Sequence, residues 1–101
     1  MSDGERKHLW KVVRERAQAG NADALNVLGS LYVDEALRLK DEALLDAAED
    51  NFKKAAIAGH SVASEFVRAR WPELKEKYAA DIREAKSRNQ GRNPGRTTDR
   101  S

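Results

Sequence analysis

Residues 21–60 read NADALNVLGSLYVDEALRLKDEALLDAAEDNFKKAAIAGH, and this stretch decides the fold. Its apolar side chains recur at three- and four-residue steps, which is the spacing along one face of an α-helix. Alanine, the best helix former, is its commonest residue, and it contains no proline. The segment therefore predicts a helix that begins after Asn21, which can cap it, and another that ends before Gly59.

The boundary between these two helices is less sharply marked. Residues 33–46 contain neither Gly nor Pro, so one rod over residues 21–58 is an alternative. Such a rod would greatly exceed the usual helix length of about 10–14 residues. We therefore expect a break at residues 40–42, where Asp41 can cap the second helix.

The flanking sequence continues the helical pattern on both sides. Gly20 ends a first helix over residues 5–19, and Ser61 can cap a fourth helix. A fifth helix is expected from Pro72 to Ser87, because proline suits a first helical turn while the residue before it is disfavoured in a helix. The sequence predicts an all-α fold of about five helices, with a flexible segment at residues 1–4, a helical domain at 5–88 and a disordered basic tail at 89–101.

Composition and charge exclude several classes of protein. Of the 101 residues, 36% are charged, 40% are hydrophobic and none is cysteine, so disulfides and thiolate chemistry are absent. Neither a secretory signal nor a stretch of about 18 apolar residues is evident. We expect a cytoplasmic protein without a membrane partner.

An internal repeat appears when the chain is aligned with itself at an offset of 39 residues. AQAGNADALNVL, at residues 17–28, then pairs with AIAGHSVASEFV, at residues 56–67. Small residues recur at matching positions, as is typical of stacked helical hairpins.

The residues of this repeat resemble the Sel-one-like repeats, which are relatives of the tetratricopeptide repeats. The matching positions are Ala24, Leu28, Gly29, Leu31 and Tyr32, followed by Ala48, Phe52, Lys53, Lys54, Ala55, Ala56, Gly59 and His60. The resemblance implies a short right-handed array of antiparallel helical hairpins, of the α-solenoid type. Two departures are VDEALRLKDEALLD at residues 33–46, in place of a Gly-containing loop, and Arg68 in place of a packing glycine.

The resemblance also implies a partner-binding concave face. Its positions would be Asp23, Asn26, Ser30, Val33 and Asp34, continued by Val62, Glu65 and Ala69. An ordinary solvated surface is the alternative. Trp10 and Trp71, near the two ends of the array, are either buried capping aromatics or exposed anchors for a partner.

Nothing in the sequence indicates catalysis. His8 and His60 are 52 residues apart, without carboxylates at ligand spacing, so we expect no metal site and interpret His60 as a turn residue. Without strands there is no strand-linked phosphate loop. We expect no cofactor and no enzymatic activity.

The sequence is most compatible with a protein–protein interaction module, either an adaptor or a regulator. One alternative is an inhibitor or immunity-type protein that occludes a larger protein. Another is a nucleic-acid-binding protein assisted by an electrostatic tail. The basic residues of that tail are Lys86, Arg88, Arg92, Arg96 and Arg100.

Overall fold

The structure, a computed structural model, describes residues 2–91 and contains five helices in that range. They are α1 (Asp3–Gln18), α2 (Ala22–Leu39), α3 (Ala43–Ile57), α4 (Ser61–Ala69) and α5 (Trp71–Gly91). The described residues form no strand. The all-α prediction is confirmed, whereas the right-handed solenoid arrangement stays a prediction.

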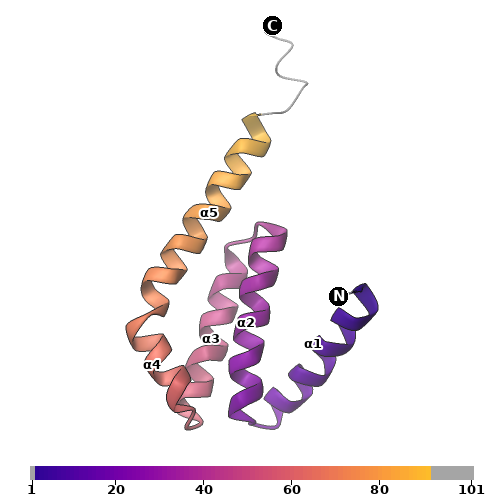
Figure 1. The fold of residues 1–101 in the computed structure, drawn as a ribbon, viewed down its shortest axis with the longest axis vertical. Helices are drawn as coiled ribbons and strands as arrows, with labels where there is room; N and C mark the ends of the chain where they lie inside the picture. Colours follow the sequence, from indigo (N-terminus) through magenta and orange to yellow (C-terminus); the bar gives the residue numbers. More distant parts are fainter. Residues whose placement is uncertain (1, 92–101) are drawn as a thin grey trace, which may run out of the picture.

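The helices lie side by side around a central hairpin of α2 and α3 (Figure 1). α1 packs against α2 near the turn that joins them, and its N-terminal end leans away from α2. α4 and α5 lie on the opposite side of the hairpin, where both contact α3. The molecule is only 17 Å across its shortest axis, so it approximates a single layer of helices.

Two glycines make the tight connections that the sequence predicts. Gly20 has a φ of 92° and Gly59 has a φ of 100°. Residues other than glycine rarely adopt this backbone conformation. After Gly20, the side chain of Asn21 accepts a hydrogen bond from the backbone N–H of Ala24 at 2.9 Å. The predicted cap of α2 is therefore confirmed.

The break between α2 and α3 also lies where the sequence places it. Lys40 takes a left-handed conformation (φ 55°, ψ 48°) and ends α2. Asp41 then accepts a hydrogen bond from the backbone N–H of Ala43 at 3.0 Å. The single-rod alternative is wrong because the chain reverses direction here (Figure 1).

The fourth helix has a different cap from the one expected. His60, rather than Ser61, is its N-cap, and His60 Nδ1 accepts a hydrogen bond from the backbone N–H of Ala63 at 3.0 Å. Ser61 is already the first helical residue. The imidazole reaches the third N–H of the helix as a shorter capping side chain does.

The helical region is longer at both ends than expected. α1 begins at Asp3, inside the segment expected to be flexible, because Ser2 and Glu5 form a capping box. Ser2 Oγ accepts from the N–H of Glu5 at 3.1 Å, and Glu5 Oε1 accepts from the N–H of Ser2 at 2.9 Å. At the other end α5 extends to Gly91, so residues 89–91 are helical and not part of a disordered tail. The rest of the expected tail, residues 92–101, lies outside the described residues.

The start of α5 also differs from the expectation, by one residue. Trp71 is helical, and the boundary lies at Arg70, whose φ is −119°. Pro72 is consequently the second helical residue, where its missing N–H is not needed for a helical hydrogen bond.

Two clusters of buried side chains hold the array together. The first joins α1, the hairpin and the start of α4, and it consists of Val13, Ala17, Ala24, Leu25, Leu28, Ala55 and Ala63. The second joins the hairpin to α5 and consists of Ala36, Leu45, Ala48, Phe52, Trp71 and Ile82. In the second cluster, Phe52 packs edge-to-face against Phe66 and Trp71, with ring centroids 5.0 and 5.2 Å away.

Candidate functional site

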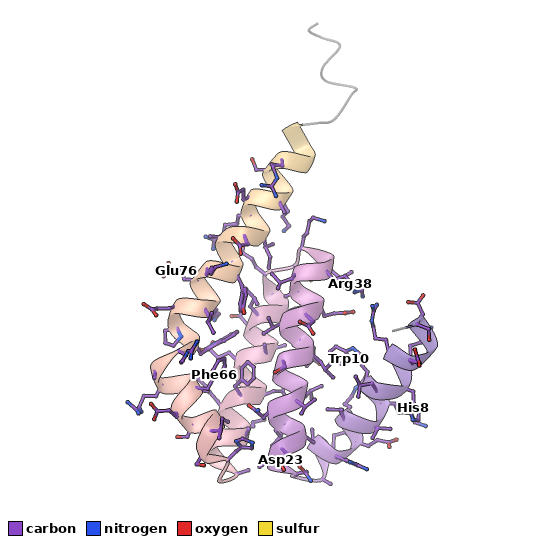
Figure 2. All side chains as sticks on the ribbon, in the orientation of Figure 1. His8, Trp10, Asp23, Arg38, Phe66 and Glu76 are labelled. Atoms are coloured by element: carbon purple, nitrogen blue, oxygen red, sulfur yellow. The ribbon has the colours of Figure 1, made fainter. Side chains whose placement is uncertain are left out.

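An open cleft lies between α1 and α2, where the two helices diverge. It has a volume of about 660 Å³. We call it the α1–α2 cleft, and its lining residues are Asp3, Arg6, Lys7, Trp10, Arg14, Tyr32, Glu35, Arg38, Leu39 and Leu44. Figure 2 shows Trp10 of α1 and Arg38 of α2 on the two sides of this space.

The apolar part of the cleft is built around an aromatic pair. The rings of Trp10 and Tyr32 meet edge-to-face with centroids 5.0 Å apart and an interplanar angle of 82°. Both side chains are only partly buried against the first cluster. Leu39, at the last turn of α2, keeps 52% of its surface exposed. Partly exposed aromatic and aliphatic groups in a concave site are typical of surfaces that bind other molecules.

The charged part of the cleft carries four basic and two acidic side chains. Each acid has a basic neighbour on its own helix. Arg38 donates two hydrogen bonds to Glu35, at 2.6 and 3.2 Å, and Arg6 lies 4.0 Å from Asp3. The hydrogen bonds to Glu35, and to a lesser degree the charge of Asp3, raise the pKa of Arg38. Glu35 is therefore held in a hydrogen-bonded ion pair, whereas Asp3, whose side chain is 92% exposed, makes only the longer contact.

The other two cations have no such neighbour. Within residues 2–91, neither Lys7 nor Arg14 has a carboxylate oxygen within 4.0 Å. The guanidinium of Arg14 lies 5.9 Å from the ring centroid of Trp10, in the range of a cation–π contact. The cleft thus has an excess of positive charge beside an apolar floor.

The predicted concave face does not line this cleft. On α2, Asp23 is 89% exposed, and its Oδ1 lies 3.0 Å from Nε2 of His60. Asn26 is partly buried, Ser30 is exposed, and Val33 packs against the second cluster. Asp34, also exposed, lines a smaller cleft of about 190 Å³ that includes Trp10.

The α4 part of that face lies elsewhere. Val62 and Glu65 line a separate shallow cleft together with Phe66, and Val62 is 67% exposed. Glu65 forms an ion pair with Arg68 of the same helix, and Ala69 is exposed. The predicted positions are thus divided between at least two surface depressions.

The two tryptophans differ in their environment. Trp71 is only 1% exposed and belongs to the second cluster, which corrects the possibility that it is an exposed anchor. Its indole N–H has no hydrogen-bond partner among the described residues. Trp10 lies in the α1–α2 cleft and stays a candidate anchor.

The remaining candidate residues form no second site. His8 is on the exposed surface of α1, away from the hairpin (Figure 2). In the described range, no three His, Asp or Glu side chains are grouped as metal ligands. Of the predicted electrostatic tail, Lys86 is exposed and Arg88 pairs with Glu84 at 3.3 Å. Arg92, Arg96 and Arg100 lie outside the described residues.

Of the residues that line the cleft, only Trp10 is indicated as a binding residue by the sequence. Arg14 lies four residues after Trp10, a spacing that places two side chains on the same helix face, so this contact had a local signal. The sequence indicates Tyr32 only as a position of the apolar pattern and of the repeat, and it assigns Leu39 no individual role. Their role in the cleft depends on how α1 is oriented, for which the sequence has no local signal.

Comparisons with known proteins add no identification. No protein-family model, curated protein or solved structure matches the chain. The resemblance to Sel-one-like and tetratricopeptide repeats gains no support from these searches and stays a prediction. No helix in residues 2–91 combines the length and apolar character needed to cross a bilayer.

Proposed function

We propose that this protein is a non-enzymatic interaction module that binds another protein in the α1–α2 cleft. The observation that carries the proposal is the coexistence, in one open cleft, of the Trp10–Tyr32 pair and the half-exposed Leu39. Tryptophan and tyrosine are enriched among the residues that dominate binding energy at protein interfaces. Arginine is enriched as well, and three arginines line the same cleft.

The predicted concave face supports a second location for the same function. Val62 is 67% exposed beside the partly buried Phe66, so a partner could also dock on α4. The α1–α2 cleft is the stronger candidate, because it has a larger volume than the α4 cleft and contains both aromatic and charged groups.

Site-specific photo-crosslinking in cells tests the proposal and separates the two locations. A photoreactive amino acid replaces Leu39 in the cleft, Val62 on α4, or Ile57, an 86% exposed control position. We expect a discrete protein adduct from position 39 and none from position 57. An adduct from position 62 alone would move the site to the predicted face, and equal adducts from all three positions would contradict a specific module.

A truncated chain and an activity assay of the crosslinked partner test the alternative functions. If removal of residues 92–101 abolishes the crosslinked adducts, the basic tail rather than the helical surface carries recognition. An inhibitor or immunity-type role would be indicated if the crosslinked partner loses its own activity when it is bound. An adaptor would leave that activity in place.

A further inference from the structure

The distribution of charge restricts the chemistry of a partner for the α1–α2 cleft. α1 carries five basic and three acidic side chains, whereas residues 22–91 carry eleven basic and thirteen acidic ones. The positive charge of the folded region is therefore concentrated on the helix that forms one wall of the cleft. The two cleft cations that have no carboxylate oxygen within 4.0 Å, Lys7 and Arg14, are both on that wall.

The apolar groups restrict the partner further. Leu39 and Leu44 are aliphatic, and they lie in the same cleft as the edge-to-face pair of Trp10 and Tyr32. The guanidinium of Arg14 covers one face of the Trp10 ring, so that face is not open for stacking of a nucleic-acid base. Aliphatic side chains with nearby carboxylates match these groups better than nucleotides do.

The chain's own C-terminal segment is a poor match for the cleft. Residues 86–101 carry five basic side chains and one acidic side chain. Like charges along the cleft would oppose its entry. Moreover, α5 lies on the other side of the α2–α3 hairpin from α1 (Figure 1).

Resting on the proposed function above, we propose that the α1–α2 cleft binds an acidic amphipathic segment of a partner protein. Its apolar side chains contact Trp10, Tyr32 and Leu39, and its carboxylates pair with Lys7 and Arg14. Pairing with charges that lack carboxylate neighbours gives the partner an electrostatic gain without breaking the Glu35–Arg38 hydrogen bonds.

Selection from a peptide library tests this chemistry directly. The full-length protein selects from random phage-displayed peptides of about four helical turns, without any assumption about the natural partner. We expect the enriched sequences to combine Leu or Phe with several Asp or Glu. Enrichment of neutral or basic sequences, or no enrichment, would overturn the proposal.

A matched pair of variants locates the binding. Lys7→Gln with Arg14→Gln removes the two cleft cations, while Lys11→Gln with Arg16→Gln removes two exposed cations of α1 that do not line the cleft. For the best selected peptide, we expect the cleft variant to weaken binding about tenfold and the control variant to change it less than about twofold. Equal effects would show that only the net charge of α1 matters.

Tryptophan fluorescence gives a readout at the site itself, because Trp71 is buried and Trp10 is partly exposed. The peptide should change Trp10 emission, and replacing its acids with amides should weaken binding about tenfold. Competition by single-stranded DNA would instead favour a nucleic-acid ligand, and concentration-dependent sedimentation without peptide would favour a second copy as the occupant. Either result contradicts the proposal.

Failure of this proposal is distinguishable from failure of the proposed function. If position 39 crosslinks a partner but the selected peptides show no acidic preference, the interaction module stands and only the partner chemistry is wrong. If position 39 captures nothing and no peptide is enriched, the module itself is contradicted.

Discussion

At the scale of single residues, Gly29 shows how close packing limits the sequence. A Cβ atom at this position would lie 2.6 Å from two ring carbons of Phe52. The Phe52 ring cannot easily move away, because it is 3% exposed and packs against Phe66 and Trp71. Gly29 is therefore a glycine at the contact between α2 and α3.

We expect Gly29→Ala to lower the free energy of unfolding by about 1–3 kcal/mol through overpacking, although alanine favours helix formation. Gly4→Ala is the matched control, because a Cβ atom there meets no heavy atom within 4 Å and should cost nothing. Urea unfolding of both variants is the measurement. Equal stability of Gly29→Ala and wild type would show that the α2–α3 contact is looser than described.

Lys40 has a left-handed backbone conformation, which is sterically unfavourable for a residue that has a Cβ atom. It is the non-glycine residue with positive φ in residues 2–91. Lys40→Gly should raise the free energy of unfolding by about 1 kcal/mol, because glycine adopts the left-handed region without steric cost. Lys40→Val should lower it, since β-branched residues are most disfavoured there. Thermal melts of the two variants should shift in opposite directions, and shifts of the same sign would contradict strain at this position.

At the scale of elements, ion pairs tie α5 to α3. Arg83 donates to both carboxylate oxygens of Glu42 at 2.8 Å, and Lys75 Nζ lies 2.8 Å from Glu49. Hydrogen bonds from Arg83 lower the pKa of Glu42, and those from Lys75 lower the pKa of Glu49. The residues of the Arg83–Glu42 pair are 41 positions apart in the chain, and those of the Lys75–Glu49 pair are 26 positions apart.

The lowered pKa values of Glu42 and Glu49 determine how the stability of the protein changes with pH. Because each carboxyl titrates below its ordinary pKa of 4.5, its stabilising contribution is complete above that value and is lost as the pH falls through the lowered one. Glu42→Gln with Glu49→Gln should therefore flatten the loss of melting temperature on acidification below pH 4.5. Glu15→Gln with Glu73→Gln, two exposed positions, should leave that acid sensitivity close to wild type. Identical pH profiles for all proteins would contradict a role of the α3–α5 pairs.

At the scale of the whole molecule, α1 is an outer helix of the array. It packs mainly against α2 and contributes only Val13 and Ala17 to the buried residues. Its N-terminal end leans away from α2 (Figure 1), and Asp3, Arg6 and Lys7 line the cleft. A helix with few buried apolar contacts opens at a lower free energy than the core does.

We expect amide hydrogen exchange to show lower protection across Asp3–Gln18 than across the α2–α3 hairpin. A peptide bound in the cleft should raise the protection of α1 selectively, because binding stabilises the closed state. Uniform protection of all five helices would contradict this hierarchy. The measurement also reports whether α1 is a movable wall of the cleft.

Much of the fold follows from the sequence, because helix formation depends on near neighbours in the chain. The three- and four-residue apolar spacing, the glycines at positions 20 and 59 and the Asn21 cap each act within about one helical turn. The Ser2–Glu5 capping box was equally local and was visible in the sequence, although the segment was expected to be flexible. The extension of α5 to Gly91 shows that the end of a helix is harder to read than its existence.

The candidate site was decided only by the tertiary structure. Trp10 and Trp71 have the same chemistry, yet one lies in an open cleft and the other is enclosed by Phe52 and Phe66. The cleft exists because α1 diverges from α2, and that angle depends on contacts between side chains such as Trp10 and Tyr32, 22 positions apart. Helical periodicity says which face of each helix is apolar. It does not say how much of that face a neighbouring helix covers, because coverage depends on the packing of the whole array.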